Sequence, residues 1–119
     1  MSVTRRAGPL TVRFFRMKSG REPVLDWIRA RSAKERKVLG EEIRTVQLGW
    51  PLGMPVVKKL ETDLWEIRVR LPSATARLLF TVLRDEIVLL HAFMKKSQRT
   101  PGDDLALARQ RRNLVLNDS

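Results

Sequence analysis

The side chains best suited to chemistry fall between residues 66 and 96 of the sequence. Arg68 and Arg77 stand in two successive apolar stretches, and the adjacent pair Lys95 and Lys96 follows a third. An arginine fork matches phosphate oxygens bidentately, so Arg68 and Arg77 are suited to holding a phosphodiester. Neighbouring like charges disfavour each other's protonation, which makes Lys95 or Lys96 a candidate for moving a proton. Clustered cations repel one another, so this set indicates an anion-binding surface.

Two further groups near these cations can carry protons, Glu66 and the single histidine, His91. Glu66 has two interpretations, a group that assists proton transfer or a counter-charge that neutralises Arg68. His91 shares the alternation phase of Ile87 and Leu89, which is more typical of a structural histidine than of a catalyst. It stays a candidate because Lys95 and Lys96 follow it closely.

The sequence offers little support for metal or cofactor chemistry. One histidine and no cysteine leave no transition-metal cluster, and no P-loop or dinucleotide-binding fingerprint is present. We therefore expect neither a metal nor a cofactor. RNA carries its own nucleophile, the 2′-hydroxyl, and a protein need only align it, stabilise the developing charge with fixed cations and move protons. This favours RNA over DNA or protein as the substrate.

Alternating apolar residues predict the strands that must position these groups. Between Leu64 and Leu71, apolar residues alternate with Glu66, Arg68 and Arg70, which predicts a strand with one charged face. Residues 76–83 and 86–93 predict two more strands, and the short turns between all three predict an antiparallel meander. Antiparallel pairing can bring charges from neighbouring strands into one patch.

Helical spacing, caps and turn residues predict the other elements. They are a strand near residues 10–17, a helix over residues 23–30, a helix over residues 32–49 that begins with a Ser-x-x-Glu capping box, and a last helix. The last helix has Thr100 as cap and Pro101 at its first position, and Arg109, Arg111 and Arg112 complement the dipole at its other end. The predicted order is β-α-α-β-β-β-α. This is an α+β fold in which the N-terminal strand joins the three-stranded meander in one sheet, with a helical hairpin and a C-terminal helix packed on it.

Length and composition limit the remaining possibilities. The 119 residues predict one domain, with residues 1–9 as a flexible basic arm that contains Arg5 and Arg6. A net charge of +11 attracts polyanions such as RNA. The absence of cysteine excludes a disulfide-stapled secreted fold and favours the cytoplasm. No apolar run is long enough for a membrane span, so we expect no membrane partner.

Three segments resemble the phage-derived, HigB-like branch of the RelE/ParE toxin superfamily. They are LWEIR at residues 64–68, ARLLF at residues 76–80, and LHAFMKK at residues 90–96 with Pro101 beyond. The resemblance covers roughly residues 12–114. It implies a RelE-like fold and a type II toxin-antitoxin toxin, an endoribonuclease that inhibits translation by cleaving mRNA on the ribosome. It also implies a cognate HigA-like antitoxin with a helix-turn-helix.

The resemblance also implies roles for individual residues. Arg77 resembles the arginine that holds the scissile phosphate, and Arg68 stands where such toxins often place a basic catalytic residue. Lys95 or Lys96 resembles the basic residue after the last strand. The candidate RNA contacts are Lys58, Lys59, Arg70 and Arg99.

One departure from the family pattern leaves the general base open. Some RelE-type toxins use a tyrosine near the C-terminus, whereas this sequence contains no tyrosine. Glu66, His91 or a lysine must then serve. The alternatives to an endoribonuclease are a non-catalytic RNA- or protein-binding module, such as a degenerate toxin, and a ParE-like gyrase inhibitor.

Overall fold

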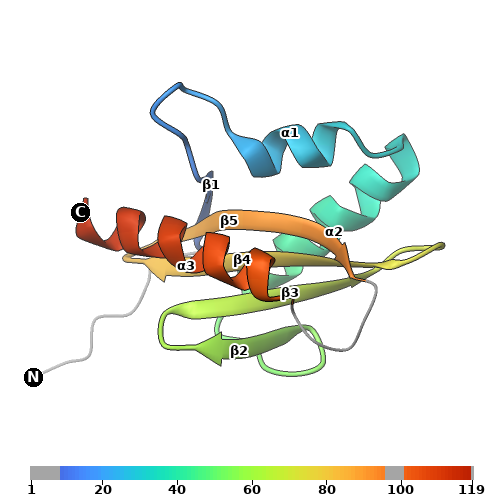
Figure 1. The fold of residues 1–119 in the computed structure, drawn as a ribbon. Coiled ribbons are helices and arrows are strands. Elements are labelled where there is room, and N and C mark those ends of the chain that lie inside the picture. Colours follow the sequence, from blue (N-terminus) through green and yellow to red (C-terminus); the bar gives the residue numbers. More distant parts are fainter. Residues whose placement is uncertain (1–8, 96–100, 119) are drawn as a thin grey trace, which may run out of the picture.

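The computed structural model describes residues 9–95 and 101–118, which form one sheet with helices on both faces (Figure 1). The elements in chain order are β1 (Thr11–Phe14), α1 (Pro23–Arg29), α2 (Ala33–Gly49), β2 (Val57–Glu61), β3 (Leu64–Arg70), β4 (Thr75–Leu83), β5 (Glu86–Lys95) and α3 (Gly102–Asn117). The predicted α+β class is confirmed, with the N-terminal strand, the helical hairpin and the C-terminal helix in their expected places.

The five strands are ordered β1-β5-β4-β3-β2 across the sheet. Strands β2 to β5 pair antiparallel with their chain neighbours, so the predicted meander is confirmed. Strand β1 joins the sheet beside β5 in parallel, from Thr11 opposite Glu86 to Phe14 opposite Leu89. The sheet is therefore mixed, and its first and last strands in chain order, β1 and β5, are neighbours in space.

Strand β2 was not among the predicted elements. Only Val57 of its residues is buried, and Lys58 and Lys59 are exposed. A five-residue strand with one core position lacks the alternation by which a strand is recognised. The pairing with β3, in which Val57 lies opposite Ile67, supplies the stability that local sequence does not.

The helical hairpin begins and ends where the sequence indicates. The Ser32 hydroxyl accepts a hydrogen bond from the Glu35 backbone N–H at 3.1 Å, and the Ser32 N–H donates to the Glu35 carboxylate at 3.2 Å. This is the predicted capping box, which satisfies two donors that the first turn leaves unpaired. Helix α2 ends at Gly49 before Pro51, and its Leu39, Ile43 and Val46 are buried.

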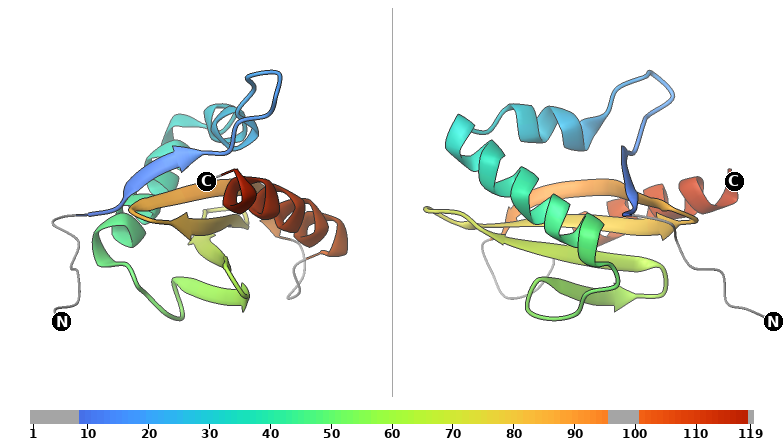
Figure 2. Two further views of the ribbon diagram at one scale, coloured as in Figure 1. Left: turned by 90° about the vertical axis from the view of Figure 1, so that its left-hand side faces the viewer. Right: turned by 180° about the vertical axis from the view of Figure 1, so that it is seen from behind.

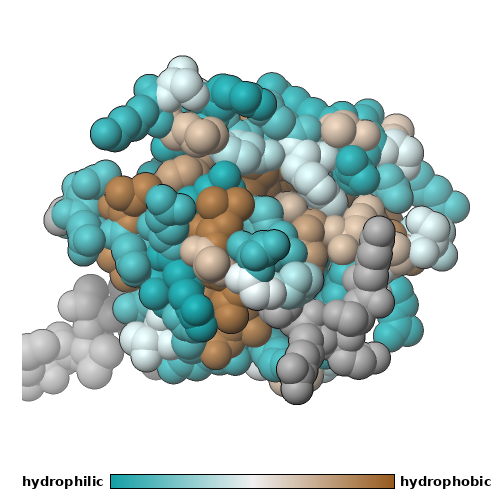
Figure 3. Space-filling model, in the orientation of Figure 1, coloured by the Kyte–Doolittle hydropathy of each residue, from teal (hydrophilic) through white to brown (hydrophobic). Residues whose placement is uncertain are grey.

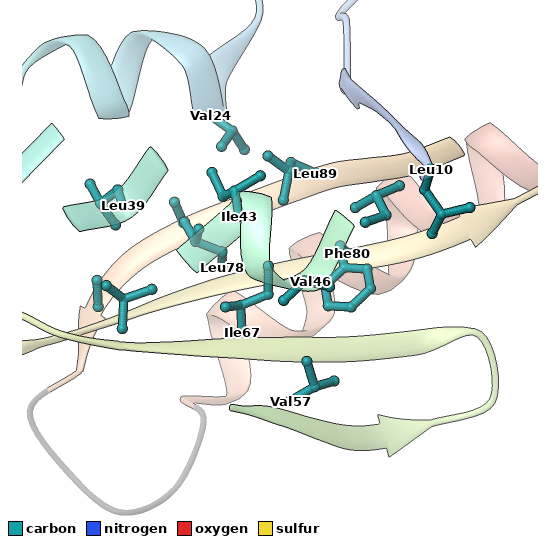
Figure 4. Close-up of a cluster of buried hydrophobic side chains, with 14 of the residues drawn as sticks. Leu10, Val24, Leu39, Ile43, Val46, Val57, Ile67, Leu78, Phe80 and Leu89 are labelled. Carbon is teal, nitrogen blue, oxygen red and sulfur yellow. The ribbon is translucent and has the colours of Figure 1, made fainter. Parts of the chain in front are cut away.

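Two apolar clusters hold the helices to opposite faces of the sheet (Figure 2). The first cluster packs α1 and α2 against one face, where Leu39, Val46, Ile67, Leu78 and Phe80 meet (Figure 4). The second cluster packs α3 against the other face. Its buried members are Phe15, Leu64, Leu79, Val88, Leu90, Phe93, Ala108 and Val115.

The three tryptophans belong to the first cluster. Trp27, Trp50 and Trp65 are partly buried and pack against it. The rings of Trp50 and Trp65 meet edge to face at 5.0 Å, and Trp65 stacks on Phe80 at 5.9 Å. Trp65 is thus a packing residue, because its ring face lies against another core ring.

A register shift in β5 overturns the predicted phase of His91. Leu79 pairs with His91 but the next residue, Phe80, pairs with Leu89, so Leu90 is the extra residue of a bulge. Ile87 and Leu89 therefore face α1 and α2, whereas His91 faces α3. A bulge changes which side chains share a face, and alternation alone does not reveal one.

Helix α3 differs from its prediction at both ends. Pro101 occupies the N-cap rather than the first helical position, since its ψ of 145° is extended, and Thr100 lies outside the described residues. The helix continues to Asn117, so Arg109, Arg111 and Arg112 lie in its middle and not in the last turn. No helix in the described ranges is long and apolar enough to cross a membrane.

Candidate RNA-binding site

The α3 side of the sheet gathers the predicted site residues through its strand register. Arg68 of β3 lies directly opposite Arg77 of β4. Glu66, two residues before Arg68 and on the same side of β3, lies opposite Lys58 of β2. Lys95 of β5 lies opposite Thr75, which is two residues before Arg77. Side chains directly opposite or diagonal across antiparallel strands are within reach of one another.

A buried ion pair lies at the centre of this surface. Arg77 Nη1 donates to Glu66 Oε1 at 2.8 Å, and the two side chains are 4% and 1% exposed. A charge-assisted hydrogen bond of this length offsets part of the cost of removing both charges from water. Burial lowers the pKa of Arg77, and the carboxylate of Glu66 opposes that effect.

The pairing corrects two expectations for Glu66. The sequence placed Glu66 on the charged face of a half-buried strand and offered it as a counter-charge that neutralises Arg68. The carboxylate is instead fully buried and binds Arg77, because Leu64 and Leu79 on the same face belong to the α3 core cluster. Glu66 therefore fixes the direction of a buried guanidinium.

Arg77 keeps one donor free. Its Nε is buried and has no hydrogen-bond partner among the described residues. An unsatisfied buried donor costs roughly 1–3 kcal/mol, and more when the group is charged. The unmet Nε lies beneath the surface, so it marks a buried cation with spare donor capacity and not a contact that is open to an outside acceptor.

Four cations surround the Glu66 carboxylate, and we call Lys58, Arg68, Arg77 and Lys95 the cationic cluster. Burial lowers the pKa of Lys95 most, the charge of Arg77 lowers it further, and those of Arg68 and Lys58 add smaller effects in the same direction. Glu66 acts in the opposite sense. The cluster thus keeps a net positive charge, and each cation is close enough to make the Lys95 ammonium less favourable.

A hollow of about 350 Å³ lies at the β3 edge of this surface, beside the residues that precede β2. Arg68, Arg70 and Thr75 line it from the sheet, and Glu42 of α2 and Pro55 line it from the opposite side. Arg70 is exposed at the end of β3 and was predicted as an RNA contact. The hollow adjoins the cationic cluster through Arg68.

The other predicted contacts lie elsewhere. Lys59 is opposite Trp65, whose ring packs on the α1–α2 side, so Lys59 is on the face away from the cationic cluster. Lys96 and Arg99 lie outside the described residues, as does the predicted basic arm apart from Pro9. The structure therefore places Lys58 but not Lys59 beside the arginines.

His91 is engaged in attaching α3 to the sheet. Its Nε2 is hydrogen-bonded to the Asp104 carboxylate at 2.5 Å, and its ring stacks on Phe93 with centroids 5.6 Å apart. Asp104 lies in the first turn of α3, where a carboxylate also complements the helix dipole. This arrangement fits a structural histidine better than a proton carrier, because one ring nitrogen is already occupied.

Sequence reasoning missed both carboxylate partners that organise the site. Arg77 is the only charged residue in the stretch ARLLF, and Glu66 is the only acid in LWEIR on the neighbouring strand. A lone charge in a buried strand requires a counter-charge, so the pair could have been inferred. The contact between His91 and Asp104 had no local signal, since it depends on how α3 docks. Among the described residues, no group of three potential metal ligands converges.

The fold and this surface define a class: a small basic α+β protein with arginines on adjacent strands of an antiparallel sheet. Residues 26–113 match the family model described as "Phage derived protein Gp49-like (DUF891)". The match spans most of the chain, which therefore belongs to the Gp49-like family, a member of the RelE/HigB-like toxin group. None of the curated proteins matches the chain.

Proposed function

We propose that this chain is the toxin of a type II toxin-antitoxin pair and a metal-independent endoribonuclease that cleaves mRNA on the ribosome. The observation that carries the proposal is the cationic cluster, in which Arg68 lies directly opposite Arg77 and Lys95 stands on the next strand beside them. The cluster suits a phosphodiester, since it combines a preoriented guanidinium with two further cations from adjacent strands. Membership in a toxin family supports the same class of function.

The reaction needs only groups that RNA and the cluster supply. The 2′-oxygen attacks the adjacent phosphorus while its proton leaves to a base, and the bond from phosphorus to the 5′-oxygen breaks. The products are a 2′,3′-cyclic phosphate and a 5′-hydroxyl, which takes up a proton. Arg77 and Arg68 would hold the non-bridging oxygens and stabilise the charge that grows on them.

Lys95 is the described group best suited to take the proton. Glu66 is buried against Arg77, and His91 is bonded to Asp104. Lys95 lies at the cluster, and burial beside Arg77 lowers its pKa, so a larger fraction of its amine is neutral than in an ordinary lysine. Lys96, outside the described residues, is a further candidate for protonating the leaving oxygen.

The test is cleavage of ribosome-bound transcripts by the purified chain. We expect Arg68→Ala and Arg77→Ala to reduce the cleavage rate by at least about 100-fold, as removal of one stabilising donor does in other sites. Arg44→Ala is the matched control, because Arg44 is an exposed arginine on α2 away from the cluster. Intact transcripts and unimpaired growth on expression of the wild type would overturn the proposal.

Two outcomes would assign a different function. A chain that binds RNA, loses affinity on Arg68→Ala and never cleaves would be a docking module. Induction of DNA-damage signalling with messages intact would indicate a gyrase inhibitor. The HigA-like antitoxin proposed as partner is tested by growth rescue on co-expression of the product of an adjacent gene that encodes a helix-turn-helix protein.

A further inference from the structure

A second surface, on the other side of α3 from the cationic cluster, is apolar. A groove of about 370 Å³ runs between α3 and the segment that follows β1. We call it the α3 groove and define it by Phe15, Met17, Lys18, Leu107, Arg111 and Leu114. Figure 3 shows apolar side chains at the surface between α3 and the loop that precedes α1.

The groove exposes large apolar side chains that the fold does not need. Met17 is 42% exposed and Leu114 is 47% exposed. Leu107 and Leu114 are seven residues apart on α3, so they stand two turns apart on one side of the helix. This stripe is separate from Ala108 and Val115, which bury α3 against the sheet. Contiguous apolar side chains at a surface are a common feature of protein docking sites.

Arg111 at the base of the groove lacks an acidic partner. Its Nη1 donates to the Leu90 carbonyl at 2.8 Å, and its guanidinium lies 5.3 Å from the centre of the Phe15 ring. No carboxylate in residues 9–95 or 101–118 forms an ion pair with it, whereas Arg109 and Arg112 share Glu61. Burial alone lowers the pKa of Arg111, with no opposing carboxylate.

The chemistry of the groove therefore specifies what it accepts. Its floor is apolar, and among the described residues its charged lining consists of Lys18 and Arg111, with no acid. An Arg fork has five donors, and the bond to Leu90 uses one of them. A partner that carries leucine-like side chains flanked by carboxylates would cover the apolar stripe and compensate the partly buried guanidinium.

We propose that the α3 groove binds an acidic amphipathic helix of a partner protein. A helix fits because the groove follows α3 from Leu107 to Leu114, so apolar residues of the partner at i, i+3, i+4 and i+7 meet its stripe. Glutamates on the partner's flank meet Lys18 and Arg111. This inference goes beyond the proposed function, because the groove lies apart from the cationic cluster and stands whether or not the chain cleaves RNA.

The test is an NMR titration of the isotope-labelled full chain with a capped synthetic helix that has leucines at that spacing and glutamates on both flanks. We expect shift changes concentrated at the α3 groove residues. Leu114→Lys should weaken binding at least about tenfold, and Lys18→Glu several-fold. A peptide with lysine in place of each glutamate should not bind.

Matched variants separate the groove from general attraction to a basic chain. Leu48→Lys adds the same charge at an exposed leucine of α2, and Lys37→Glu reverses an exposed lysine of α2. Both should bind the acidic peptide like the wild type. Equal effects of Leu114→Lys and Leu48→Lys, or shift changes confined to Arg68 and Lys95, would overturn the proposal. So would concentration-dependent dimerisation abolished by Leu114→Lys, or displacement of the peptide by a short RNA at this groove.

Discussion

Glu66 and Arg77 have different neighbours, so we expect replacement of each partner to change the stability of the chain by a different amount. Removal of the Glu66 charge by Glu66→Gln leaves all four cations of the cluster without their common carboxylate. Removal of the guanidinium by Arg77→Met leaves the carboxylate with Lys95, which still interacts with it, and opposite Lys58 of β2. We therefore expect Glu66→Gln to destabilise the chain more than Arg77→Met, although the second change removes the larger polar group.

The magnitude follows from the geometry. At the 2.8 Å separation of Nη1 and Oε1, the gross Coulomb attraction is roughly 6 kcal/mol at an effective dielectric constant of about 20. Desolvation of both groups cancels much of that energy, and removal of one partner of a buried pair costs about 3–5 kcal/mol in practice. We expect about 4 kcal/mol for Glu66→Gln, about 3 kcal/mol for Arg77→Met, and a double variant well below their sum.

Urea denaturation at pH 7 measures all three variants. Sulfate should raise the free energy of unfolding of Glu66→Gln more than chloride does at equal ionic strength, because a divalent oxyanion can replace the missing carboxylate among the cations. Arg77→Met should show a smaller difference between the two salts. A free energy of unfolding for Glu66→Gln within about 0.5 kcal/mol of the wild type, or strictly additive single effects, would refute the reasoning.

Three further predictions concern proton transfer, acid stability and capping. Cleavage should rise with pH through a midpoint below that of an ordinary lysine, since burial lowers the Lys95 pKa, and Lys95→Met should remove this rise in a pH–rate profile. Hydrogen bonds from Arg109 and Arg112 lower the pKa of Glu61 in the folded chain. The stability that these bonds add is therefore present above the unfolded pKa of Glu61 and is lost as the pH falls through its folded pKa. In urea titrations, the stability of Glu61→Gln should decline less than that of the wild type below about pH 4.5. Ser32→Ala should cost about 1 kcal/mol by loss of the capping box, with Ser73→Ala as the neutral surface control in the same denaturation assay.

The sequence predicted those parts of the fold that have local signals. The capping box at Ser32, the end of α2 at Gly49 and the alternation of β3 each depend on residues close in the chain. Strand β2 and the β5 bulge depend on pairing between strands, and neither leaves a pattern within its own segment. Pairing with a neighbouring strand stabilises β2, and it shifts His91 to the other face.

The candidate site was likewise predicted from the sequence only in part. The sequence predicted that antiparallel pairing can bring the charges of β3 and β4 together, and the register places Arg68 opposite Arg77. The sequence did not reveal that Glu66 binds Arg77, because the depth of a side chain depends on what α3 covers. Arg111 was interpreted as a helix-end charge, and only the docked helix reveals its place in a groove.

The parallel pairing of β1 with β5 has a consequence for the order of folding. The meander from β2 to β5 joins neighbours through short turns, so its contacts close small loops at low entropic cost. The contact of Thr11 with Glu86 closes a loop that includes both helices of the hairpin and three strands. We therefore expect β1 to dock last, in the final stage of folding. In a nascent chain, β1 would remain unpaired until β5 has been synthesised.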